Sequence, residues 1–149
     1  TNKVKYLNHK ITMIHSLDRF PLLETLNLHG EKRNIIWTTL VQVNVAGDPA
    51  KAGLMPEEAA DFLDSVGGFP YVRVHGLMTI GALEASIAET QGFFRRLREL
   101  RDKLQSANRP GVDLRELSMG MSQDFEQAIE EGATLVRVGS QIFGTRQKA

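Results

Sequence analysis

The chain has 149 residues, enough for one domain with its own core, and its 18 Lys and Arg residues balance 18 Asp and Glu residues. This neutral charge argues against a nucleic-acid binder, because such proteins carry a basic excess. The lack of cysteine excludes disulfides, thiolate metal sites and thiol nucleophiles. No apolar run approaches the roughly 20 residues of a membrane helix, so we expect a cytoplasmic protein with no membrane partner.

Short apolar segments and amphipathic segments alternate along the chain. In sequence order, the segments predicted as strands are residues 11–17, 35–45, 71–80, 114–119 and 134–138. The segments predicted as helices follow each strand in turn, at residues 20–28, 56–66, 83–106, 122–131 and from 141 onward. Asp18 and Ser122 are the predicted N-caps of the first and fourth helices, and Gly132 lies just past the end of the fourth.

Strands that alternate with helices, without hairpin signals, indicate parallel strands joined by crossover helices. The third helix has the clearest pattern, with one apolar stripe formed by Phe93, Leu97, Leu100 and Leu104. Two architectures satisfy the pattern of five strands: an open doubly wound sheet, or part of an eightfold barrel. Periodicity alone does not choose between them.

Parallel α/β folds bind ligands at the carboxyl ends of their strands, so the residues there are the candidates for a site. The last two strands end in turns that contain Gly120 and Gly139, each followed by a predicted helix start. Such turns expose backbone N–H groups to an anion, and Arg137 nearby would meet a phosphate, a carboxylate or a ring nitrogen. The alternative is that both glycines only permit tight turns.

The histidines are weaker candidates for a site. Their spacing matches no metal-binding motif, and we expect no metal. His15, near the end of the first predicted strand, is the one with a position from which it would face a ligand. His75 lies within a predicted strand and is interpreted as a packed or surface residue.

Five segments together carry a resemblance to a known family. They are Gln42-Val43-Asn44, Lys51-Ala52-Gly53, Gly76-Leu77-Met78-Thr79-Ile80, the segment from Leu117 to Asp124 and the segment from Val136 to Arg146. This set resembles the pyridoxal phosphate homeostasis protein family, which is related to the amino-terminal barrel of alanine racemase. The last two segments are long and specific, and the resemblance spans almost the whole chain.

The resemblance implies an α/β fold of the (β/α)8 TIM-barrel type that binds pyridoxal 5′-phosphate (PLP). Residues 1–149 would form the carboxyl-terminal two-thirds of that barrel domain, with about five β/α units holding the fourth to eighth strands. The family binds PLP as a Schiff base with a lysine on its first strand. No lysine of this chain lies in a motif that matches the first strand of the family, so the resemblance implies that covalent attachment through that lysine is not available here.

The resemblance also places the cofactor-binding positions of the family. They fall on Asn44, Met78, Ser118, Ser122, Arg137, Gly139 and Ser140. The two serines before the fourth helix would face the phosphate, and the backbone of residues 139–140 would form the other half of the cradle. Arg137 would lie near the pyridine nitrogen, and Met78 and Asn44 would line the pocket.

The implied function is PLP homeostasis: a non-catalytic carrier or regulator of the cofactor that affects amino-acid balance. An arginine is always protonated, so Arg137 would keep the pyridine nitrogen unprotonated and weaken the ring as an electron sink. One alternative is a PLP-dependent enzyme similar to an amino-acid racemase, which needs the lysine and a second acid–base group. The other is an incomplete barrel that acts as an interaction module, self-associating through its open edges.

Overall fold

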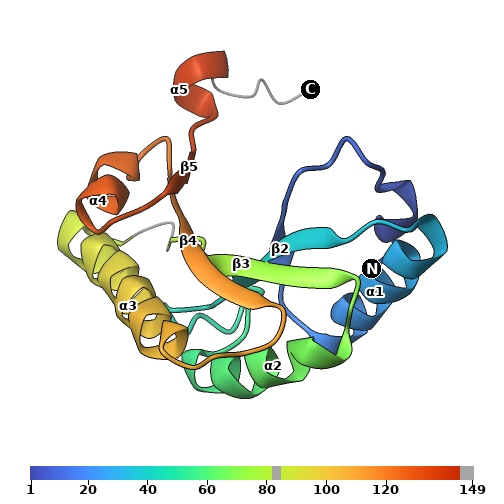
Figure 1. The fold of residues 1–149 in the computed structure, drawn as a ribbon. Coiled ribbons are helices and arrows are strands. Elements are labelled where there is room, and N and C mark those ends of the chain that lie inside the picture. Colours follow the sequence, from blue (N-terminus) through green and yellow to red (C-terminus); the bar gives the residue numbers. More distant parts are fainter. Residues whose placement is uncertain (82–84, 145–149) are drawn as a thin grey trace.

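The computed structural model describes residues 1–81 and 85–144, and its five strands form one curved parallel sheet (Figure 1). The strands are β1 (Ile14–Leu17), β2 (Trp37–Gln42), β3 (Val72–Met78), β4 (Val112–Met121) and β5 (Leu135–Arg137). They pair in chain order, β1-β2-β3-β4-β5, and every pair is parallel. The parallel pairing was predicted, whereas the strand order was left open between two architectures. A doubly wound sheet reverses its strand order part-way, and this sheet does not.

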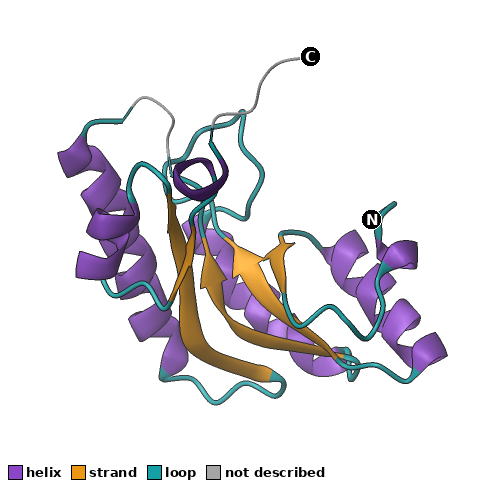
Figure 2. Cartoon of the chain, turned by 90° about the horizontal axis from the view of Figure 1, so that it is seen from above, coloured by secondary structure: helices purple, strands orange, loops and turns teal. Residues whose placement is uncertain are grey.

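Helices follow the strands and cover one side of the sheet. They are α1 (Phe20–Arg33), α2 (Ala59–Ser65), α3 (Ile87–Gln105), α4 (Phe125–Glu130) and α5 (Ser140–Phe143), with short 3₁₀ helices η1 (Val4–Tyr6), η2 (Pro56–Glu58) and η3 (Val66–Gly68). Helices α1 to α4 lie along the outer, convex side, and the inner side is concave (Figure 1). The strands point toward the same edge, where the loops gather (Figure 2). This arrangement is the wall of a β/α barrel.

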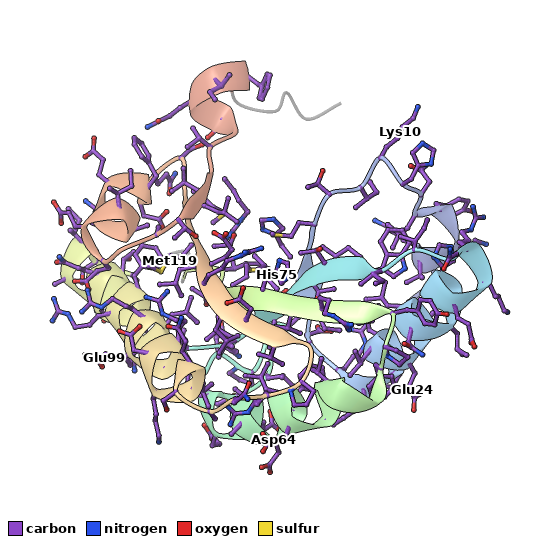
Figure 3. The ribbon with its side chains drawn as sticks, in the orientation of Figure 1. Lys10, Glu24, Asp64, His75, Glu99 and Met119 are labelled. Carbon is purple, nitrogen blue, oxygen red and sulfur yellow. The ribbon has the colours of Figure 1, made fainter. Side chains whose placement is uncertain are left out.

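The core fills the space between the sheet and the outer helices. On α3 the predicted stripe faces the sheet: Leu97 and Leu104 are buried, and Phe93 and Leu100 pack against the core. Phe94 is fully buried beside them. Charged side chains such as those labelled on α1, α2 and α3 point outward to solvent (Figure 3). The 3.6-residue period of α3 therefore produces one buried and one solvated face.

The first helix starts at the predicted residue, but its N-cap and its end differ from the prediction. Helix α1 begins at Phe20 with Arg19 as its N-cap, and no side chain caps it. The predicted cap, Asp18, is wrong because its carboxylate accepts a hydrogen bond from the Arg19 guanidinium at 2.6 Å instead. The helix continues past its predicted end to Arg33, where Asn34 adopts a left-handed conformation and ends it.

The third helix begins with a capping box. The Ser86 hydroxyl accepts a hydrogen bond from the Glu89 backbone N–H at 3.3 Å, and the Glu89 carboxylate accepts one from the Ser86 N–H at 2.8 Å. These two contacts satisfy donors that a helix start leaves without partners. The start predicted at Leu83 lies outside the described residues.

The fourth helix also starts later than predicted. It begins at Phe125, and Ser122 does not cap it because the Ser122 hydroxyl accepts a hydrogen bond from Gly139 N–H at 3.0 Å. The predicted end is confirmed: Gly132 lies just past the helix with a positive φ of 87°. Ser122 is therefore used to join two loops at the carboxyl edge of the sheet.

A bulge sets the register between β3 and β4. Val74 and Gly76 are two residues apart on β3, whereas their register partners on β4, Val112 and Glu116, are four residues apart. Directly after the bulge, Gly76 lies so close to its register partner Glu116 that an added Cβ would overlap the Glu116 carbonyl oxygen. Beyond Gly76 the register is regular and places Ser118 opposite Met78. The bulge thus determines which β4 residue reaches the carboxyl edge.

The described residues, 1–81 and 85–144, contain no helix with the length and apolar character needed to cross a membrane.

Candidate functional site

A cavity of about 410 Å³ opens beside the carboxyl ends of β3, β4 and β5. Its walls are Lys51, Ile80, Gly81, Met121, Ser122, Gln123, Asp124, Arg137, Gly139 and Ser140. Four of the predicted site residues are in this set. The other three do not line the cavity and are buried within the sheet and its loops: Asn44, Met78 and Ser118. The cavity therefore lies at the edge that the strand-end rule predicts, and only some of the predicted residues line it.

Arg137, at the end of β5, is the most constrained cation of the cavity. Its Nη1 donates to the Ser118 hydroxyl at 2.6 Å, and its Nη2 donates to the Thr79 carbonyl at 2.8 Å. Burial lowers the pKa of Arg137, and the nearby Asp124 carboxylate partly offsets this effect. A guanidinium starts so high that it stays protonated. These two contacts use two of its five N–H donors and fix the plane of the group.

Both acceptors of Arg137 are themselves fixed. The Thr79 N–H donates to the Ser118 carbonyl at 3.0 Å, and the Thr79 hydroxyl donates to the Val43 carbonyl at 2.8 Å. Thr79 is 1% exposed and Ser118 is fully buried. The Arg137 guanidinium is therefore held by backbone and side-chain groups that tie together the carboxyl ends of β2, β3 and β4.

Two loops meet at Ser122. Its hydroxyl accepts hydrogen bonds from Gly139 N–H at 3.0 Å and from Gln141 N–H at 3.4 Å, which joins the turn after β4 to the turn after β5. At Gly139 an added Cβ would find no atom within 4 Å, so this residue leaves open space at the cavity wall. A ligand can approach the backbone closely there. At Gly120, by contrast, an added Cβ would lie 2.6 Å from the Ala128 side chain, which is a packing reason for glycine.

Asn44 shapes a loop that brings Lys51 to the cavity. Its side-chain amide donates to the Asp48 carbonyl at 2.7 Å and accepts from the Asp48 N–H at 3.3 Å. The Lys51 ammonium then donates to the Gly81 carbonyl at 2.5 Å. Gln42 supports the same loop, because its amide donates to the Ala52 carbonyl at 2.9 Å. Asn44 does not line this cavity itself, and its predicted contact with the cofactor stays a prediction.

The sequence interpretation missed two charged cavity residues, Lys51 and Asp124. Asp124 lines the cavity, and its carboxylate accepts a hydrogen bond from Met121 N–H at 2.6 Å. Both residues lie inside the segments that carry the family resemblance, which was the available signal. Among the described lining residues two cations face one carboxylate, so the cavity carries a net positive charge that favours an anion.

His15 is connected to the site without lining the cavity. Its Nδ1 lies 3.0 Å from the Ser118 hydroxyl, the same oxygen that accepts from Arg137. Burial lowers the pKa of His15, and the positive charge of Arg137 lowers it further. Both effects favour the neutral form of the His15 imidazole.

No group of three or more His, Asp or Glu side chains in the described part of the chain is arranged to hold a metal ion.

Residues 3–147 match the family described as "Alanine racemase, N-terminal domain". The chain belongs to this family. A pyridoxal phosphate homeostasis protein of Aquifex aeolicus is 47% identical over 147 residues, which cover 99% of this chain and 64% of that protein. The structure of PipY from Synechococcus elongatus without PLP has a TM-score of 0.88 and 37% identity, covering 97% of this chain and 66% of that one. PipY with PLP bound has a TM-score of 0.84 and 34% identity, covering 96% and 66%.

The alanine racemase N-terminal family resolves the choice that the sequence pattern left open. The five strands are part of a TIM barrel and not a doubly wound sheet, and the predicted fold class is confirmed. The chain spans less than two-thirds of the length of these relatives. The assignment of residues 1–149 to the carboxyl-terminal two-thirds of a barrel domain stays a prediction.

The cavity of this alanine racemase N-terminal family member has the chemistry that PLP requires. PLP carries a negatively charged phosphate and phenolic oxygen, and the net positive charge of the cavity favours such an anion. A planar ring needs apolar wall, which Ile80 and Met121 provide. Because Gly139 has no side chain, the cavity wall keeps open space beside its backbone for a ligand.

Proposed function

We propose that this chain binds PLP in the cavity beside the carboxyl ends of β3, β4 and β5, as part of a protein that carries the cofactor and regulates its supply. The observation that carries the proposal is the Arg137 guanidinium, which lines the cavity and is fixed by Ser118 and Thr79. The name of the Aquifex aeolicus relative and the PLP-bound structure of PipY support the choice of ligand.

The roles of the cavity residues follow from their chemistry and from the family resemblance. Arg137 would hold the ring nitrogen as a hydrogen-bond acceptor, and Ser122 with the backbone of residues 139–140 would hold the phosphate. Lys51 would add a second positive charge to the cavity wall. PLP supplies an aldehyde and a ring that accepts electrons. A ring whose nitrogen is unprotonated accepts electrons less well. A fixed arginine therefore suits a carrier.

The test is titration calorimetry with pyridoxine 5′-phosphate. This compound keeps the ring and phosphate of PLP but has an alcohol in place of the aldehyde, so it cannot react with surface lysines. We expect saturable binding of one molecule per chain, competed by PLP. Arg137→Gln should weaken binding by about tenfold or more, because it removes a charge-assisted hydrogen bond.

The matched control is Arg96→Gln, which removes the same charge from the exposed side of α3. It should bind like the unsubstituted chain. The proposal is refuted if the unsubstituted chain shows no saturable binding. It is also refuted if the two arginine variants bind equally well while both are folded.

The expectations for partners and location are less constrained by the structure. Within the described sheet, β1 and β5 each pair on one side only, which keeps self-association through these edges a prediction. The cytoplasmic location also remains a prediction.

A further inference from the structure

His15 reaches across the concave side of the sheet to a residue on which the cavity depends. Its ring lies on β1, and the Ser118 hydroxyl that it contacts lies on β4. Because β2 and β3 separate these strands, the contact spans the inside of the curve and does not follow neighbouring strands. His15 does not line the cavity, but Ser118 holds Arg137, which does.

The contact with Arg137 fixes one of the hydrogen-bond directions at the Ser118 hydroxyl. A guanidinium has only donors, so the Ser118 oxygen must accept from Arg137. The one proton of the Ser118 hydroxyl is then available to the neighbour at 3.0 Å, the Nδ1 of His15. A neutral imidazole accepts at one nitrogen and donates at the other, so donation from Ser118 to Nδ1 requires the His15 proton to be on Nε2.

We propose that His15 is a positioning residue for the PLP site: it accepts the Ser118 proton and thereby turns the Ser118 lone pairs toward Arg137. This inference rests on the proposed function. Ser118 is fully buried, so its hydroxyl has no water to replace a lost acceptor. Without His15, no acceptor would hold the Ser118 hydroxyl proton in one direction. The hydroxyl would then rotate, and its oxygen lone pairs would no longer be fixed toward Arg137.

The effect of losing His15 is limited by the second anchor of Arg137. The contact of Arg137 Nη2 with the Thr79 carbonyl does not involve His15 and would persist. The guanidinium would therefore keep its place and lose its fixed orientation. A loss of one neutral hydrogen bond corresponds to a threefold to tenfold change, so we expect pyridoxine 5′-phosphate to bind about three to ten times more weakly.

The test compares His15→Leu with His15→Asn by calorimetry with pyridoxine 5′-phosphate. Leucine removes the acceptor, whereas asparagine carries an oxygen close to the position of Nδ1. We expect His15→Leu to weaken binding and His15→Asn to restore most of it. His75→Leu is the matched control, because the contact of His75 is with Arg115 and not with a cavity residue. It should bind like the unsubstituted chain.

A double substitution separates positioning from general damage to the fold. If His15 acts through Arg137, His15→Leu should have no further effect on binding in a chain that already carries Arg137→Gln. Equal weakening in both backgrounds would overturn the inference. So would His15→Leu binding as well as the unsubstituted chain, or His15→Asn binding no better than His15→Leu.

A second measurement needs no ligand. Nitrogen-15 NMR of the imidazole should show Nδ1 of His15 unprotonated and Nε2 protonated at pH 7. A proton on Nδ1 would overturn the inference whether or not the ligand binds. Failure of the unsubstituted chain to bind pyridoxine 5′-phosphate would instead refute the proposed function, and the NMR result would still decide the role of His15.

Discussion

Replacing Gly76 by alanine should force β3 and β4 apart. The added Cβ would lie 2.0 Å from the Glu116 carbonyl oxygen, 2.7 Å from its carbonyl carbon and 2.8 Å from its Cβ. Two of these atoms are backbone, so no rotamer change can relieve the overlap. An ordinary contact begins at 3.4 Å, so the strands must separate by about 1.4 Å, the difference between 3.4 and 2.0 Å.

This displacement is large enough to break the pairing at the bulge. A ladder hydrogen bond of about 2.9 Å that lengthens by about 1.4 Å is no longer a hydrogen bond. Losing two such bonds costs about 2 kcal/mol, and overpacking of a core adds about 1 kcal/mol or more. We therefore expect Gly76→Ala to lower the free energy of unfolding by about 3 kcal/mol, a substantial part of the stability of a typical domain.

Urea unfolding followed by tryptophan fluorescence measures this loss directly. Trp37 is the single tryptophan, lies on β2 and is 1% exposed, so its emission reports loss of the core. Gly68→Ala is the matched control, because an added Cβ at Gly68 meets no atom within 4 Å. If Gly76→Ala unfolds at the same urea concentration as Gly68→Ala, the argument from the β4 bulge is wrong.

Two further predictions concern a helix cap and the histidines. Ser86→Ala should destabilise the protein by about 1 kcal/mol in urea unfolding, because the hydroxyl no longer accepts from Glu89 N–H at the start of α3; Ser86→Asp keeps an acceptor and should restore stability. The pKa values of His15, His29 and His75 are all lowered, first by burial, so the unfolded chain binds protons that the native chain does not. The contribution of these histidines to the free energy of unfolding should therefore be fully present above the unfolded pKa of 6.5 and should fall as the pH drops below it. Urea midpoints measured across this window should fall less steeply for His15→Asn than for the unsubstituted chain, and equal slopes would contradict the assignment of His15 as a buried neutral group.

Local patterns in the sequence were sufficient for the elements and for the edge that carries the site. The period of the apolar residues from Phe93 to Leu104 requires one buried helical face, and the structure has it. Helix ends were less predictable, because a cap depends on competing partners. Asp18 bonds to Arg19, and Ser122 bonds to Gly139, so neither was available as a cap.

The residues of the candidate site also divide into those that the sequence predicts and those that it does not. Arg137, Ser122 and the backbone at Gly139 were predictable, because they follow parallel strands and all such strands end at one edge. The roles of Lys51 and Asp124 were not. Lys51 reaches the cavity only through contacts to the Gly81 carbonyl, 30 residues away in the chain, and local propensity carries no information about such a contact.

By itself, the sequence determined the order of strands and helices along the chain and indicated the edge of the sheet at which the candidate site lies. Only the tertiary structure decided which of these residues contact one another. The β4 bulge next to Gly76 places Ser118 at the carboxyl edge, and the curvature of the sheet brings His15, 103 residues away in the chain, within 3.0 Å of it. Both are consequences of how strands pair and bend together, and the side-chain pattern of any one strand does not specify them.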